Sequence, residues 1–169
     1  MNATLTMRPT VRRATISLIL TIAAVALSQV SIPVGIARIS PTQHCINVLA
    51  AVLVGPWWGL GVALATSAAR LGLGLGTPLA FPGSVFGVLL ASWLFQRSRT
   101  LLLAALGELV GTGLIGALAG AALVAPYVMG QPVALTVLIV PFALSSAVGA
   151  ALALLMLHLA GVGGEEAGR

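Results

Sequence analysis

Long apolar segments alternate along this chain with short breaks that contain glycine, proline or arginine. A helix needs about 20 apolar residues, at a rise of about 1.5 Å each, to cross the hydrocarbon core of a bilayer. The pattern predicts six such helices, at about residues 14–32, 44–54, 57–75, 79–95, 101–124 and 133–159. The second spans only about 16 Å, so we expect it to be tilted, buried or extended by its flanks. A loop over residues 33–42 is expected to cap the outer side.

Composition supports a membrane protein and excludes several other classes. Hydrophobic residues make up 59% and charged residues 7% of the 169 positions, whereas a soluble domain carries about 25% charged residues. A water-soluble enzyme and a disordered chain are therefore excluded. The single cysteine, Cys45, excludes a disulfide framework. No polar linker is long enough to separate two domains, so residues 1–169 are expected to form one all-α, multi-pass domain in the plasma membrane.

The distribution of arginines predicts the orientation in the bilayer. Cytoplasmic loops carry an excess of positive charge, so six crossings with both termini in the cytoplasm are favoured. Six arginines then lie inside: Arg8, Arg12, Arg13, Arg97, Arg99 and Arg169. Arg38 and Arg70 lie outside. Because the arginines are scattered between apolar runs, nucleic acid is not an expected partner. An alternative interpretation takes residues 1–26 as a cleaved signal peptide, since residues 24–26 resemble a cleavage site.

The first helix carries a stripe of small residues spaced three or four positions apart. Its central members are Ser17, Thr21, Ala24 and Ser28. Small side chains let two helix backbones approach closely in lipid. The stripe therefore indicates either packing inside the protein's own bundle or a docking face for another membrane subunit. On the fifth helix, glycine pairs at 107 and 111 and at 116 and 120 favour internal packing.

Two ionisable residues fall inside predicted helices. A charge at the centre of a bilayer costs about 3 kcal/mol or more, so it should face the bundle interior and have a partner or a task. Glu108 lies about 10 Å into the fifth helix, in the inner half. Arg70 has three interpretations: it extends outward to the membrane surface, it pairs with Glu108, or it faces a ligand.

Polar side chains gather near the outer ends of the second and fourth helices. Gln43, His44 and Asn47 open the second segment at helical spacing. Phe81 and Ser84 follow a stretch rich in glycine and proline, and irregular backbone at membrane depth is tolerated where it lines a cavity. Amide, imidazole and hydroxyl groups beside an aromatic ring suit a small, flat, weakly polar ligand. We expect the binding site here.

Motifs for chemistry are missing from the sequence. It contains no Walker A, H-E-x-x-H or G-x-S-x-G pattern. Its three acidic residues cannot form a cluster for Mg²⁺ within the membrane. We therefore predict no catalytic residue, no metal and no cofactor. The competing hypotheses are a membrane-embedded enzyme acting on a lipid or isoprenoid, and a structural subunit without a ligand.

Four stretches together resemble the ThiW family. They are ISPTQHCINVLAAVLVGPWWG at 39–59, TSAAR at 66–70, LAFPGSVFG at 79–87 and ALGELVGTGLIGAL at 105–118. The resemblance covers about residues 14–160. It implies a six-helix S subunit of an energy-coupling factor (ECF) transporter, which binds the thiamin precursor hydroxyethylthiazole, or another vitamin such as thiamin.

The same resemblance implies partners. Transport would require a transmembrane T subunit and two ATPase subunits. In related S subunits an Ala-x-x-x-Ala motif on the first helix contacts the T subunit. This chain departs from that motif, because it offers Ser17-x-x-x-Thr21 and Ala24-x-x-x-Ser28 instead.

Overall fold

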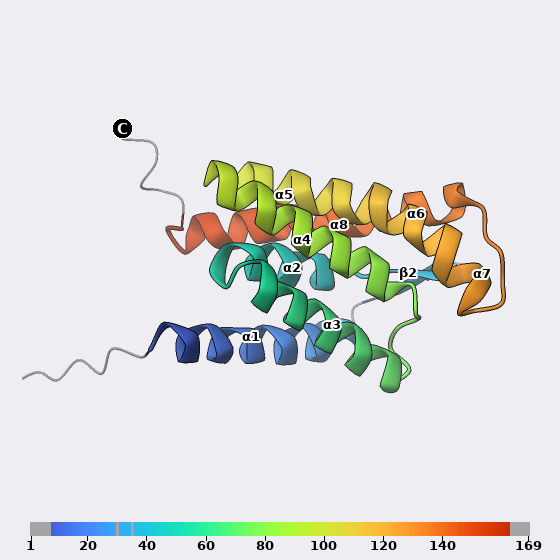
Figure 1. Ribbon diagram of the computed structural model, residues 1–169, viewed down its shortest axis with the longest axis horizontal. Helices are drawn as coiled ribbons and strands as arrows, with labels where there is room; N and C mark the ends of the chain where they lie inside the picture. The colour runs from blue at the N-terminus through green and yellow to red at the C-terminus, as the bar shows by residue number, and fades with distance from the viewer. Residues whose placement is uncertain (1–7, 30, 35, 163–169) are drawn as a thin grey trace, which may run out of the picture.

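Helix dominates the computed structural model, which describes residues 8–29, 31–34 and 36–162 (Figure 1). The main helices are α1 (Pro9–Ala26), α2 (Pro41–Leu53), α3 (Pro56–Gly72), α4 (Ala80–Ser98), α5 (Leu101–Val110) and α8 (Leu135–Leu159). A 3₁₀ turn, η1 (Leu27–Gln29), extends α1. The chain after α5 stays helical through η2 (Gly111–Gly116), α6 (Ala117–Ala119), η3 (Gly120–Val124) and α7 (Ala125–Tyr127). The described residues thus form six helical rods.

Proline and left-handed residues set several helix boundaries. Pro9, Pro41 and Pro56 stand in the first turns of α1, α2 and α3, where the missing N–H has no intrahelical partner to lose. Gly55, with φ of 87°, lets the chain turn directly from α2 into α3. Arg99 ends α4 in the left-handed conformation, with φ of 57°.

A β-hairpin stands where the sequence predicted a capping loop. Strands β1 (Ile32–Val34) and β2 (Ala37–Ile39) pair antiparallel, with Ile32 opposite Ile39. Several predicted helix boundaries were also wrong: α1 begins at Pro9 and ends at Ala26, α2 begins at Pro41, α3 ends at Gly72 and α4 runs on to Ser98. Strands of three residues are too short to show an alternating pattern, and hydropathy does not register a polar first or last turn of a helix.

Three rods are long and apolar enough to cross a membrane: Pro9–Gln29, Leu101–Tyr127 and Leu135–Leu159. The interpretation as an all-α membrane protein is consistent with this result. The crossings by α2, α3 and α4, and the single domain over residues 1–169, stay predictions. The short second helix, α2, contacts α1, α3, α4, α5 and α8. Nine of its 13 residues are buried, so its polar side chains face the protein interior.

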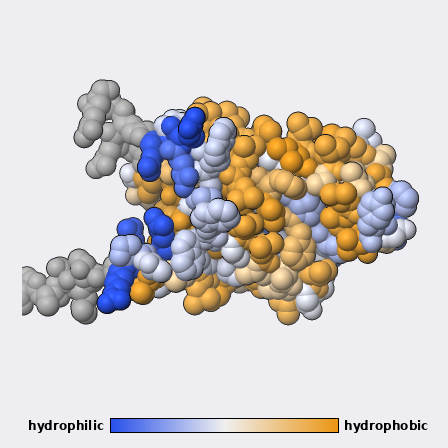
Figure 2. Space-filling view, viewed as in Figure 1, coloured by the Kyte–Doolittle hydropathy of each residue, from blue (hydrophilic) through white to orange (hydrophobic). Residues whose placement is uncertain are grey.

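The two ends of the bundle differ in polarity. The start of α1 and the end of α8 lie at the same end (Figure 1), and hydrophilic residues gather there while apolar residues cover the middle (Figure 2). We call this the arginine-rich end, after Arg8, Arg12, Arg13, Arg97 and Arg99. The hairpin and the end of α3 lie at the opposite, hairpin end. The positive-inside rule places the arginine-rich end in the cytoplasm, and this orientation stays a prediction.

Glycines allow the rod that starts with α5 to lie close against α4. A Cβ at Gly107 would stand 2.7 Å from Cα of Ala91, and one at Gly111 would stand 2.8 Å from Cα of Gly87. Such a close approach of two helix backbones is typical of interfaces that small residues form in lipid. The expectation that these glycines pack internally is therefore confirmed, and the close approach brings Glu108 of α5 up to α4.

Candidate functional site

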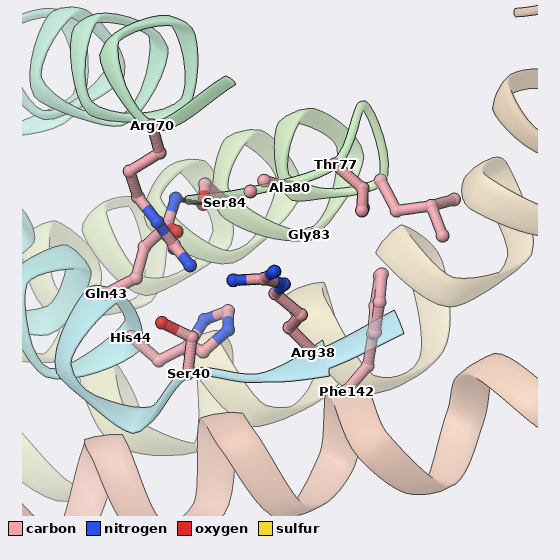
Figure 3. Close-up of a pocket in the computed structure, with 12 residues that line it drawn as sticks. Arg38, Ser40, Gln43, His44, Arg70, Thr77, Ala80, Gly83, Ser84 and Phe142 are labelled. Carbon is pink, nitrogen blue, oxygen red and sulfur yellow. Dashed lines mark hydrogen bonds between the residues drawn. The ribbon is translucent and has the colours of Figure 1, made fainter. Parts of the chain in front are cut away.

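A small polar pocket opens at the hairpin end of the bundle (Figure 3). Its cavity volume is about 30 Å³, which is room for little more than one or two water molecules. Strand β2, helices α2, α3, α4 and α8, and the connection between α3 and α4 all contribute to it. The lining residues are Arg38, Ser40, Gln43, His44, Arg70, Gly76, Thr77, Leu79, Ala80, Gly83, Ser84 and Phe142.

Gln43 joins three helices at one wall of the pocket. Its Nε2 donates to Oγ of Ser67 on α3 at 3.0 Å and to Oγ of Ser84 on α4. All three side chains are buried. Since a buried amide needs hydrogen-bond partners, these contacts fix the side chain of Gln43 and hold the hydroxyl of Ser84 at the cavity.

Beneath the pocket, a buried carboxylate collects three polar side chains. Glu108 is fully buried, and its Oε1 lies 2.7 Å from Nδ1 of His44. The same oxygen accepts from Nδ2 of Asn47 at 3.0 Å and from the hydroxyl of Thr112 at 2.9 Å. We call these four residues the carboxylate network. It connects α2 to the rod formed by α5 and η2.

The carboxylate network fixes the orientation of the His44 ring. With Nδ1 directed at the carboxylate, Nε2 makes no hydrogen bond with any residue that the structure describes. His44 also lines the pocket. Its free nitrogen is therefore available to a bound molecule, while Glu108 holds the ring in place.

Two arginines reach into the same cavity from different elements. Figure 3 shows Arg38, from β2, and Arg70, from α3, directed into the pocket. Arg38 donates from one terminal nitrogen to the carbonyl oxygen of Leu75 at 3.1 Å. Arg70 is only 2% exposed. The interpretation that it extends outward is thus wrong, and Glu108 pairs with His44 in place of Arg70. Arg70 lines the pocket, and the interpretation that it faces a ligand stays a prediction.

The structure brings together most of the residues that the sequence singled out. Gln43, His44, Arg70 and Ser84 line the pocket. Asn47 and Glu108 lie behind it, in the carboxylate network. Phe81 is partly buried on α4 but does not line the cavity. The aromatic ring at the pocket belongs to a residue of α8, Phe142.

Sequence reasoning missed several residues of this region, among them Arg38, Ser40, Phe142 and Thr112. Thr112 had a usable signal, because it stands four positions after Glu108 and so shares its helix face. Phe142 lies in an apolar helix, and nothing in the sequence around it indicates a binding site. Ser40 and Arg38 are placed by the hairpin, where the backbone N–H of Ser40 donates to Oγ of Ser145 on α8 at 2.9 Å.

The stripe of small residues on α1 lies against the rest of the bundle. Ser17, Ala24 and Ser28 are buried, and Thr21 is partly buried. Helix α1 packs on α3 and α2. This burial favours the interpretation as internal packing, and docking of a T subunit through the stripe stays a prediction. Leu18, Ile19 and Ile22 occupy the exposed face of α1.

Long apolar rods around a buried polar pocket indicate a class: a membrane protein with an internal site for a small molecule. In the part of the chain that the structure describes, no group of histidine, cysteine or acidic residues could hold a metal ion. The chain matches the family model of the thiamine-precursor transporter protein (ThiW) over residues 14–161 and belongs to this family. No curated protein and no solved structure matches it.

Membership in this family confirms the resemblance seen in the sequence. It makes the protein a member of a transporter family for thiamine precursors. A small-molecule substrate and a place in a membrane follow from the same membership. A transporter family is also consistent with the prediction that the protein is not an enzyme.

Proposed function

We propose that the protein is the substrate-binding S subunit of an ECF-type transporter in the plasma membrane and binds hydroxyethylthiazole. The observation that carries the proposal is the pocket at the hairpin end, in a chain that belongs to a family of thiamine-precursor transporters. By the positive-inside rule this end faces outward, which is the side from which a precursor is taken up.

The chemistry of the lining supports a small heteroaromatic ligand. A thiazole ring offers one nitrogen acceptor and an aromatic face, and the hydroxyethyl group both donates and accepts. His44 and Ser84 supply hydrogen-bonding groups, and Phe142 supplies a ring for stacking. A cavity of about 30 Å³ cannot hold the whole molecule. Binding therefore requires side chains around the cavity to move outward.

We propose that other subunits supply the energy for uptake. The sequence contains no Walker A motif, so the chain lacks the loop that holds the phosphates of ATP. We propose a T subunit and two ATPase subunits as its partners. A binding subunit of this kind should still bind its ligand when it is purified alone.

Calorimetry on the purified protein in lipid nanodiscs tests the proposal. We expect hydroxyethylthiazole to bind, biotin not to bind, and thiamin to bind less tightly. His44→Leu and Asn47→Leu should each weaken binding about tenfold, since the first removes a ligand partner and the second releases the carboxylate network. Leu71→Ala, at an exposed position of α3, is the control and should bind normally. The proposal fails if no precursor binds, or if both leucine variants keep full affinity.

A further inference from the structure

We propose that Arg38 and Arg70 form a subsite for an anionic group on the ligand, a phosphate ester or a carboxylate. This inference rests on the proposed function for the identity of the ring, and it adds the charge of the substrate. The simplest case is that the pocket binds the phosphate ester of hydroxyethylthiazole more tightly than the neutral alcohol.

The first observation is that Arg70 is buried without a partner. Its side chain is 2% exposed, and it makes no hydrogen bond to any residue that the structure describes. Its Nε is fully buried and unsatisfied. A charge removed from water is costly unless it is paired and hydrogen-bonded. An arginine kept in this state inside a membrane protein indicates a partner that arrives from outside the chain.

The second observation concerns the supply of negative charge. Glu108 is the single acidic residue among the residues that the structure describes. Its Oε1 is taken by His44, Asn47 and Thr112. The other two acidic residues of the chain follow the end of α8, at positions 165 and 166, outside the described residues. The second carboxylate oxygen of Glu108, Oε2, is buried and has no hydrogen-bond partner, but Glu108 pairs with His44 and forms no ion pair with Arg38 or Arg70. Within the described part, therefore, no carboxylate is paired with the arginines of the pocket.

The third observation is the convergence of the two guanidinium groups. Both reach into one cavity, from β2 and from α3 (Figure 3). Like charges in a site of low dielectric repel each other, and an anion between them would remove this repulsion. A guanidinium group presents a planar fork of N–H donors that matches the oxygens of carboxylate and phosphate. One nitrogen of Arg38 already bonds Leu75, which orients the group and leaves its other donors free.

Binding measurements with two matched ligands test the subsite. The full chain in nanodiscs is titrated with hydroxyethylthiazole and with its phosphate ester. We expect the ester to bind about tenfold more tightly or better, because charge-assisted hydrogen bonds are roughly twice as strong as neutral ones. Arg70→Gln and Arg38→Gln should each remove most of this preference while changing the affinity for the alcohol little. Arg97→Gln, which removes an exposed arginine at the arginine-rich end, should keep the preference.

Thermal unfolding without ligand separates this role from a structural one. Arg70 has no partner to lose, so Arg70→Gln should melt at the same temperature as the parent protein or higher. A lower melting temperature, with equal losses of affinity for both ligands, would show that Arg70 supports the fold and would overturn the subsite.

The remaining outcomes distinguish the subsite from the proposed function. If the alcohol binds as tightly as the ester, the subsite is wrong and the proposed function stands. If neither compound binds but inorganic phosphate raises the melting temperature only when Arg70 is present, the anion subsite stands and the thiazole ligand is wrong. If neither thiazole compound nor phosphate has an effect, both proposals fail.

Discussion

Gly87 on α4 makes room for the buried carboxylate of Glu108, and adding one methyl group there tests the carboxylate network. A Cβ built on Gly87 stands 2.6 Å from both carboxylate oxygens and also meets the hydroxyl of Thr112. Separations below 3.0 Å are essentially never seen for real Cβ atoms. In Gly87→Ala, the carboxylate or the whole of α4 must therefore move by about half an ångström or more.

The expected cost follows from this displacement. Overpacking in a close-packed interior costs about 1–3 kcal/mol, and the strained contact of Glu108 with His44 adds about 1 kcal/mol. The total is about 2–4 kcal/mol. At about 2–4 °C per kcal/mol for a chain of this size, the melting temperature should fall by about 5–15 °C. Because His44 also lines the pocket, the affinity for the ligand should fall too.

Thermal unfolding in detergent, followed by intrinsic fluorescence, measures the effect. Gly61→Ala on α3 is the matched control, because nothing lies within 4 Å of a Cβ at that position. The same substitution there should leave the melting temperature unchanged or raise it, since alanine favours a helix over glycine by about 0.5–1 kcal/mol. Equal melting temperatures for Gly87→Ala and Gly61→Ala would refute the packing of α4 against Glu108.

Three further predictions concern other parts of the molecule. Ala24→Leu should lower the melting temperature and the ligand affinity together, because Ala24 of α1 is buried against the bundle. Loss of complex formation with a T subunit at normal stability would instead support docking through the stripe. Glu108→Gln should lower the melting temperature by several degrees but change affinity less than His44→Leu does, because Glu108 does not line the pocket; calorimetry and unfolding compare the two variants. Thr100→Cys, at an exposed position in a Cys45→Ser background, should react with impermeant maleimide from the cytoplasmic side only, and labelling from outside would reverse the orientation.

The helices were predictable because their signal is long. Runs of apolar residues between glycines and prolines located all six rods, with errors of a few residues at the ends. The hairpin was not predictable in this way, because strands of three residues, Ile32–Val34 and Ala37–Ile39, carry no usable alternation. Its position depends on a tertiary contact, the hydrogen bond from Ser40 to Ser145 on α8.

The polar wall of the site was predictable for a different reason. Gln43, His44 and Asn47 are polar side chains in an apolar segment, and such residues must face partners in the bundle interior. The aromatic partner was misplaced: Phe81 was chosen for its proximity in sequence to Ser84, whereas Phe142 reaches the cavity from a helix nearly 60 positions away. Contacts between distant helices leave no local pattern.

The choice of partner for Glu108 decides the charge of the pocket. On sequence alone, Arg70 and Glu108 were able to neutralise each other, and the remaining polar groups then suited an uncharged ligand. In the structure, the carboxylate lies 2.7 Å from His44, one layer beneath the cavity. Arg70 is left in the cavity with Arg38. A histidine can be neutral whereas an arginine cannot. Because Glu108 pairs with His44 and not with Arg70, the pocket keeps the positive charges of both arginines. This separation of charge with depth is the physical ground for expecting an anionic ligand.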